Sequence, residues 1–336
     1  MSHPERGFDI KPYTRDILCY APWESPIYTT WGNSFGCFDT EKVKGYLPDI
    51  YLAGDSYTWG YAPFEAKFGT ILEKKTGRNV LKCGVPHTGQ RHQFSKFLDV
   101  SKSLGQFPKV VIVNYAMNDI VNDYAYPHST AINNQLVDNT FLKKNKDGIY
   151  EIVRIDGDAL TSTTNAEQER NKTSNIPFYY LCLKRYSASF NILNTVINNF
   201  RKNHKERNFP YDKEWRNIYR LVHTFKEFYK QEGSPIYWPY GEENRKILLK
   251  WKKHSRENNY RLIISLIPYR EEFFDVNYYH DLEYYLSQNG IESYNFEDYM
   301  TKRNIDQAGI IWSYDSHFNI KGNAVYEDYL EYILQK

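Results

Sequence analysis

Residues 49–60 read DIYLAGDSYTWG, and the rest of the chain is organised around this stretch. Residues 50–53 form a short apolar run, which predicts a buried strand. The triplet GDS at 54–56 interrupts that run, and a helical pattern follows it. A serine that ends a strand on a glycine-bearing turn can present its hydroxyl at the rim of an open α/β sheet, a common place for a nucleophile. Gly, Asp and Ser are also turn formers, so this stretch alone leaves an ordinary turn as the alternative.

The composition is that of a globular protein that is not a nucleic-acid binder. The chain has 336 residues, long enough for one large domain or two and for a substantial core. Hydrophobic residues make up 41% and charged residues 25%, as in an ordinary soluble domain. The formal net charge of +2 gives no reason to expect nucleic acid as a partner. No segment approaches the ~20 continuous apolar residues that a membrane span requires.

The termini and cysteines favour a cytoplasmic protein. The first fifteen residues, MSHPERGFDIKPYTR, contain no apolar segment typical of a secretory signal. Cys19, Cys37, Cys83 and Cys182 form no CxxC pair. The simplest interpretation is reduced thiols in a cytoplasmic protein.

Strand and helix patterns alternate on both sides of a long middle segment. We predict strands at 49–53, 79–83, 109–115, 261–267 and 291–296, and helices at 64–76, 93–104, 243–257, 281–289 and 320–334. Gly77 is the expected stop of the first helix and Asn319 the expected N-cap of the last. Such alternation is typical of βαβ units. It predicts a three-layer α/β/α sandwich with a mainly parallel sheet of about five strands.

The middle segment interrupts this alternation. Residues 124–242 show several helical patterns, including 179–199 and 214–231, and a polar stretch at 160–174 that reads as a loop. We interpret 124–242 as a mostly helical insertion or cap. The α/β domain then comprises 49–123 and 243–336, and residues 1–48 form an N-terminal arm packed on it.

Three other stretches can carry chemistry with Ser56. The loop CGVPHTGQRH at 83–92 contains glycines that allow backbone N–H groups to point at one spot, as an oxyanion hole needs. Asn118 follows the third predicted strand, where its carboxamide can donate to a developing oxyanion. Asp315-Ser316-His317 precedes the last predicted helix. His317 can take the serine proton, and Asp315 can orient the imidazole. Taken singly, these stretches are better explained as a turn, a helix cap and helix-entry packing.

Taken together, the four stretches resemble the SGNH (GDSL-type) hydrolase family. GDSYTWG matches its first block, YAMND its third and DSHFNIKGN its last. The resemblance covers roughly residues 33–123 and 243–334 and implies a flavodoxin-like three-layer fold. It places Ser56 as nucleophile, Asn118 as the oxyanion asparagine, and Asp315 and His317 as acid and base.

Three departures from the family pattern bear on the site. Asp315 and His317 are separated by one residue, not by the two of many family members; the shorter spacing is found among polysaccharide O-acetyltransferase-like members. In the second block, Gly84 is the obvious backbone donor, but counting from the strand end puts His87 in that position. The predicted oxyanion hole is therefore the N–H of Ser56, the N–H of Gly84 or His87, and the Asn118 side chain. Ala116 also stands where the family usually has glycine.

These residues predict a serine esterase acting through an acyl-serine intermediate on a small-molecule or carbohydrate ester, of an acyl or acetyl type. An O-acyltransferase that delivers the acyl group to a sugar hydroxyl is the alternative, and a non-catalytic binding module is a lesser one. We expect no metal and no cofactor, because His87 and His92 are not a convincing metal pair and no GxGxxG or Walker loop follows a strand. The oligomeric state is left open.

Overall fold

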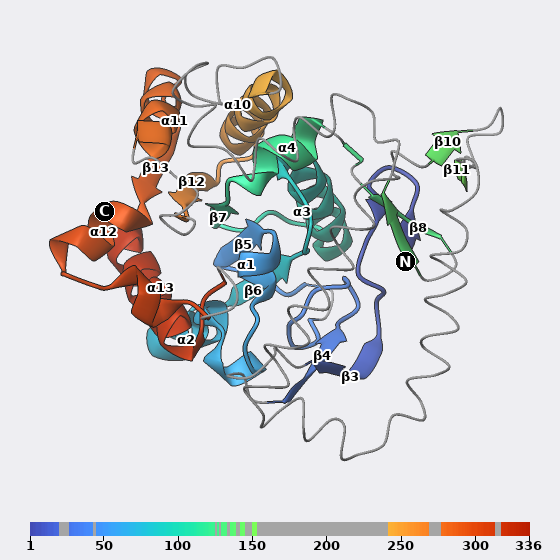
Figure 1. The fold of residues 1–336 in the computed structure, drawn as a ribbon, viewed down its shortest axis with the longest axis horizontal. Coiled ribbons are helices and arrows are strands. Elements are labelled where there is room, and N and C mark those ends of the chain that lie inside the picture. The colour runs from blue at the N-terminus through green and yellow to red at the C-terminus, as the bar shows by residue number, and fades with distance from the viewer. Residues whose placement is uncertain are drawn as a thin grey trace, which may run out of the picture. The chain divides into compact units, whose positions relative to one another are not determined.

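The computed structural model describes residues 1–19, 27–42, 45–124, 126–127, 129–132, 135–138, 142–144, 150–152, 241–268, 277–312 and 317–336 (Figure 1). The chain divides into two compact units: one comprises Met1–Val137 and Ile218–Lys336, the other Asp138–Asn217. The predicted site residues all belong to the first.

A five-stranded parallel sheet is the centre of the first unit. Its strands are β5 (Ile50–Gly54), β6 (Val80–Gly84), β7 (Val110–Tyr115), β12 (Arg261–Leu266) and β13 (Glu292–Asn295). They lie in the order β13-β12-β7-β5-β6, and every neighbouring pair is parallel. In chain order this is the 2-1-3-4-5 arrangement of flavodoxin-like folds, whose connections reverse direction between the first and third strands, here β5 and β7. All five predicted strands are confirmed.

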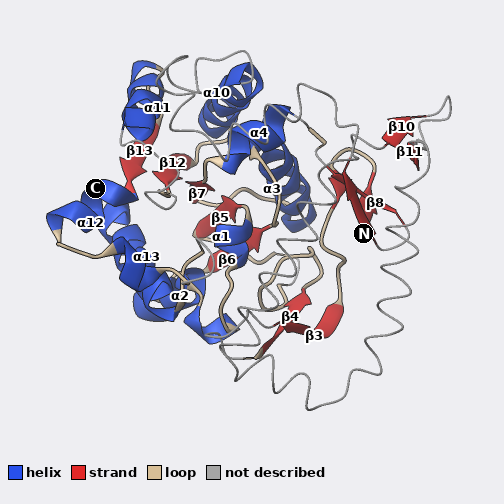
Figure 2. Ribbon diagram, in the orientation of Figure 1, coloured by secondary structure: helices blue, strands red, loops and turns tan. Residues whose placement is uncertain are grey.

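Helices cover both faces of this sheet (Figure 2). On one face α2 (Phe68–Thr76) packs against α13 (Ile320–Leu334), with the rings of Phe68 and Tyr326 4.8 Å apart. On the other face α3 (Gln90–Leu104) packs against α10 (Gly241–Glu257), with Phe97 and Trp251 5.1 Å apart. Strand β5 is therefore buried along its whole length, as expected for a parallel strand covered on both faces. The predicted α/β/α sandwich is confirmed.

The other helical elements that the structure describes in the first unit are short or lie at its edges. They are α1 (Ser56–Trp59), η1 (Phe64–Ala66), α4 (Asn118–Tyr124), α11 (Asn277–Gln288), α12 (Phe296–Lys302) and η4 (Gln307–Ile310). The last helix begins as predicted, because the Asn319 side chain accepts a hydrogen bond from Gly322 N at 2.8 Å. Helix α3 begins three residues before its predicted start, directly after Gly89. We did not predict α12 or η4. Both are only one or two turns long, so their sequences show little helical periodicity.

The residues before β5 form two small antiparallel sheets, β1 (Ser2–His3) with β2 (Gly7–Phe8), and β3 (Thr14–Cys19) with β4 (Tyr28–Gly32). Buried polar contacts join this region to α3. The Lys96 ammonium lies 2.9 Å from the Asp9 carboxylate, and His92 Nε2 lies 2.8 Å from Phe8 O. Burial lowers the pKa of His92 to about 3, so His92 is a neutral packing residue. The predicted boundary of the arm at residue 48 stays a prediction.

At the start of the predicted insertion, the structure describes four strands. β8 (Ser129–Ile132) pairs with β9 (Gln135–Asp138), and β10 (Leu142–Lys144) pairs with β11 (Tyr150–Ile152). The helices predicted at 179–199 and 214–231, and the loop at 160–174, lie outside the described residues. Among the helices that are described, none is long and apolar enough to cross a membrane.

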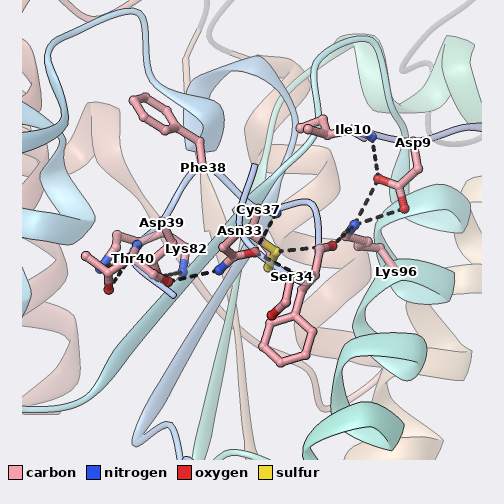
Figure 3. Close-up of a disulfide and its surroundings, with 12 residues drawn as sticks. Asp9, Ile10, Asn33, Ser34, Cys37, Phe38, Asp39, Thr40, Lys82 and Lys96 are labelled. Carbon is pink, nitrogen blue, oxygen red and sulfur yellow. Dashed lines mark hydrogen bonds and ion pairs between the residues drawn. A yellow bond between two sulfur atoms is a disulfide. The ribbon is translucent and has the colours of Figure 1, made fainter. Parts of the chain in front are cut away.

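The expectation of reduced cysteines is wrong for one pair. Cys37 and Cys83 form a disulfide, with Cα atoms 4.7 Å apart (Figure 3). The loop that carries Cys37 lies along the edge strand β6, where Asp39 accepts a hydrogen bond from Lys82 N at 3.1 Å and pairs with the Lys82 ammonium at 3.0 Å. This register places the two sulfur atoms together, although 46 positions separate the cysteines in sequence. Cys19 is a free thiol, and Cys182 lies outside the described residues.

Candidate active site

The candidate site lies at the carboxyl edge of the sheet, where β5 and β7 end. Ser56 is the first residue of α1, directly after β5 and Asp55. Asn118 is the first residue of α4, shortly after β7. Because β5 and β7 are adjacent and parallel, both side chains come to the same edge. This is the point where the strand order reverses, and open α/β sheets commonly bind their ligands there.

A buried polar contact fixes α1 over the ends of the two strands. The Asn114 carboxamide in β7 donates to Ala53 O at 3.1 Å and to Thr58 Oγ1 at 2.8 Å. Tyr326 on α13 donates to the carbonyl oxygen of the same side chain at 2.8 Å. Asn114 is fully buried, so each of these bonds replaces a lost contact with water. The strand before the nucleophile, its helix and the closing helix are thereby tied together.

Ser56 and His317 form the closest contact in the site. His317 Nε2 lies 2.7 Å from Ser56 Oγ, although the residues are 261 positions apart. The backbone at His317 and Phe318 is held by an antiparallel bridge between Ile311 and Phe318 and by a hydrogen bond from Trp312 N to His317 O at 3.0 Å. The distance suits transfer of the hydroxyl proton to the imidazole. The predicted nucleophile and base are thus brought together.

Asp315 and Ser316 lie outside the described residues. The predicted role of Asp315, which is to orient His317, therefore stays a prediction.

Asp55 is a site residue that the sequence analysis did not single out. Its Oδ1 caps α1 by accepting from Tyr57 N at 3.0 Å. Its Oδ2 accepts from the Asn118 carboxamide at 2.9 Å and lies 3.3 Å from Ser56 Oγ. Since a hydroxyl carries one proton, Ser56 cannot donate to Asp55 and His317 at once. The sequence did contain an indication of the capping role of Asp55, because an aspartate directly before the first helical residue is a preferred N-cap.

The Asp55 carboxylate fixes how Asn118 is oriented. A carboxylate only accepts hydrogen bonds, so the NH₂ end of the carboxamide is the end that faces Asp55. One N–H is used in that contact, and the described residues show no hydrogen bond from the second. Asp55 contacts both side chains and thus places Asn118 close to Ser56.

Two buried carboxyl groups lie below the site, and both have a raised pKa. Burial raises the pKa of Asp55, although the donors Tyr57 N and Asn118 oppose the shift. Asp119 is also fully buried, and burial together with the charge of Asp55 raises the pKa of Asp119 well above its usual range. Gln90 and Gln93 on α3 donate to the Asp119 carboxyl at 2.7 and 3.0 Å. These contacts attach the start of α4, and hence Asn118, to α3.

The two candidates for the second backbone donor differ in conformation. Gly84 is the last residue of β6 and lies under α1; a Cβ there would come within 2.5 Å of Thr58 C and 2.7 Å of Asp55 O. The absence of a side chain is therefore what lets α1 sit on β6. His87 has an exposed side chain and a φ of 61°, in the left-handed region that favours glycine. A residue other than glycine can serve as the main-chain donor at that position only if its φ/ψ is compatible with that role.

One group of carboxylates among the described residues is close enough to suit a metal ion, and it lies on α13 away from the site. It consists of Glu327, Asp328 and Glu331. The Lys75 ammonium lies 2.6 Å from the carboxylates of both Glu327 and Asp328. A lysine is thus already paired with two of these three carboxylates.

The fold and the site define an α/β protein of flavodoxin-like strand order that carries a serine–histidine pair at its switch point. No known family model matches the chain, and a search of curated proteins finds no match. Among solved structures, the chain is similar to a candidate lipolytic protein of the G-D-S-L family from Desulfitobacterium hafniense DCB-2. The two share 11% sequence identity at a TM-score of 0.40, over 84% of this chain and 98% of the other. These values mark a distant likeness.

Proposed function

We propose that the chain is a serine hydrolase of the SGNH type that cleaves an ester through an acyl-serine intermediate. The observation that carries the proposal is the 2.7 Å contact between Ser56 Oγ and His317 Nε2 at the carboxyl edge of the sheet. A serine hydroxyl is a weak nucleophile at neutral pH and needs an adjacent base. Asn118, held through Asp55, supplies the third group that acyl transfer requires, a donor for the developing oxyanion.

The proposed reaction has two halves. Ser56 Oγ attacks the ester carbonyl as its proton moves to His317 Nε2, and the carbonyl oxygen becomes an oxyanion. Collapse of this intermediate breaks the carbon–oxygen bond, and the departing alcohol takes the proton from His317. A water molecule then attacks the acyl-serine in the same way, which releases the acid and restores Ser56. In this scheme Asp315 orients His317 throughout.

The proposed oxyanion donors are the N–H of Ser56, the N–H of His87 or Gly84, and the Asn118 side-chain N–H that does not bond Asp55. The left-handed backbone at His87 supports that residue, because a main-chain donor at this position needs a conformation that glycine usually provides. Glycine is needed at position 84 for a separate, structural reason, because α1 packs directly against it.

Hydrolysis of p-nitrophenyl acetate and p-nitrophenyl octanoate tests the proposal. Wild-type protein is compared with Ser56→Ala and with Ser103→Ala, a matched control at an exposed serine that bonds only its own helix at Asp99 O. We expect Ser56→Ala to lose all rate above background and Ser103→Ala to keep it. The ratio of the hydrolysis rates with the two substrates indicates how long an acyl chain the pocket accepts. Equal rates for Ser56→Ala and wild-type protein would rule out the proposed chemistry.

A second candidate, an O-acyltransferase that passes the acyl group to a sugar hydroxyl, is favoured by the one-residue spacing of Asp315 and His317. It uses the same acyl-serine, and a sugar hydroxyl replaces water in the second half. Product formation that requires a sugar acceptor would favour the transferase over the esterase. A non-catalytic binding module would leave Ser56 unreactive toward a serine-directed fluorophosphonate.

A further inference from the structure

Two tyrosine rings contact the imidazole of His317. The ring centroid of Tyr61 lies 4.4 Å from that of His317, with the planes inclined by 45°. The ring centroid of Tyr57 lies 4.9 Å away, with an inclination of 40°. Both tyrosines come from the segment that carries Ser56. The segment that supplies the nucleophile therefore also contacts the base.

The surroundings hold the ring of Tyr57 and the backbone of Tyr61 in place. Tyr57 is only 2% exposed, and its ring meets the buried ring of Phe318 edge-on at 5.1 Å. Tyr61 lies in the loop after α1, where its carbonyl accepts a hydrogen bond from Trp312 Nε1 at 3.2 Å. Trp312 is also the residue whose N–H donates to His317 O. One residue thus links the backbone of Tyr61 to the backbone of His317.

A base in acyl transfer has two needs that these contacts can meet. It must stay aligned with the serine hydroxyl, because misplacement of a catalytic group by about 1 Å can lower a rate about 100-fold. It must also carry a positive charge once it has taken the proton. The face of an aromatic ring attracts a nearby cation, and the packed ring limits rotation of the imidazole.

We propose that Tyr57 and Tyr61 are positioning residues for His317, which keep Nε2 against Ser56 Oγ and stabilise the imidazolium formed during acyl transfer. The inference rests on the proposed function, since it assigns a task to two neighbours of the base. Tyr61 is the better test position, because it lies in a loop and is partly exposed, whereas Tyr57 is part of the core.

Kinetics of Tyr61→Leu and Tyr61→Phe test the role of the ring. Leucine keeps the apolar bulk and removes the aromatic face; phenylalanine keeps the face and removes the hydroxyl. With p-nitrophenyl acetate we expect Tyr61→Leu to lower kcat about tenfold, which corresponds to about 1.4 kcal/mol, with little change in KM. Tyr61→Phe should stay within about twofold of wild-type protein. Tyr284→Leu, at an exposed tyrosine on α11, is the matched control.

A double-mutant cycle shows whether Tyr61 acts through His317. In a His317→Ala background, Tyr61→Leu should change the residual rate less than about twofold, because the group it serves is absent. An equal tenfold loss in both backgrounds would overturn the inference and assign Tyr61 to the substrate or the fold. A loss in Tyr61→Phe as large as in Tyr61→Leu would also overturn it, because the hydroxyl would then be the active part.

A spectroscopic measurement separates this inference from the proposed function. In protein labelled with ¹³C at histidine Cε1, the His317 signal is assigned by its disappearance in His317→Ala. We expect Tyr61→Leu to move this signal, because the ring current of Tyr61 is lost, and Tyr61→Phe to move it little. An unmoved signal in Tyr61→Leu would overturn the inference alone. A moved signal without Ser56-dependent turnover would overturn the proposed function, and with it the catalytic part of the inference.

Discussion

Replacing Gly84 with alanine should displace Ser56 from His317. A Cβ at this position would lie 2.2 Å from Trp59 N, 2.5 Å from Thr58 C and 2.7 Å from Asp55 O, all backbone atoms of the segment that carries Ser56. Real Cβ contacts essentially never fall below 3.0 Å, so α1 and β6 must separate by about 0.8 Å at Trp59. No flexible side chain can absorb this strain, because backbone lies on both sides.

The expected losses follow from that displacement. Overpacking of this kind costs about 1–3 kcal/mol of stability. A shift of Ser56 relative to His317 approaching 1 Å would lower kcat/KM about 100-fold. Urea unfolding measures the stability change, and p-nitrophenyl acetate hydrolysis at a temperature where the variant is fully folded measures the activity.

Gly309→Ala is the matched control for this experiment. A Cβ at Gly309 meets its nearest neighbours, Lys321 Nζ and Asp306 Oδ2, at 3.7 and 3.8 Å, which is ordinary van der Waals contact. Its stability should therefore change by less than about 1 kcal/mol. The reasoning would be refuted if Gly84→Ala matched Gly309→Ala in both unfolding midpoint and rate, since α1 would then not be seated on β6 as described.

Three further predictions concern the oxyanion donor, the disulfide and a buried carboxyl. Asn118→Ala should lower kcat about 10²–10³-fold in steady-state kinetics, and an unchanged kcat would remove Asn118 from the oxyanion hole. Replacing both Cys37 and Cys83 with serine should lower the free energy of unfolding in urea by up to about 4 kcal/mol, because their bond closes a loop across 46 positions; equal stability would count against the bond. Burial raises the pKa of Asp123 to about 7, so the folded state keeps a proton that the unfolded state loses. Stability should fall by as much as about 4 kcal/mol as pH rises from about 4 to about 7, and less in Asp123→Asn; identical pH slopes would contradict this.

The strands and the layer architecture could be predicted because local pattern decides them. Continuous β-branched runs such as that of β7 specify strands buried on both faces, and helices between them require parallel pairing. The order of the strands could not be predicted in this way. Local periodicity does not say that β5 lies between β6 and β7, because that neighbour relation depends on which crossover passes over which strand.

The candidate site was predictable to the extent that its residues follow strand ends. Ser56 and Asn118 come directly after strands that share an edge, and His317 precedes the closing helix. Asp55 was overlooked because an aspartate in a GDS turn has the same appearance whether it only caps a helix or also orients a neighbour. Nothing in the sequence pointed to Tyr61, because its contact with His317 depends on the conformation of a loop and not on a residue spacing.

The disulfide was missed for a related reason. Cys37 and Cys83 share no spacing rule, and their approach depends on a loop that lies along an edge strand. Contacts such as Lys82 with Asp39 set that register, and they join residues 43 positions apart. Neither composition nor periodicity carries this information.

The most direct test of the central claim is covalent labelling by a serine-directed fluorophosphonate, followed by mass mapping of the modified peptide. The account predicts one adduct, on the peptide that contains Ser56, with no labelling in Ser56→Ala and labelling slowed at least about 100-fold in His317→Ala. An adduct elsewhere in the chain, or equal labelling of wild-type protein and His317→Ala, would contradict the assignment of Ser56 and His317 as nucleophile and base.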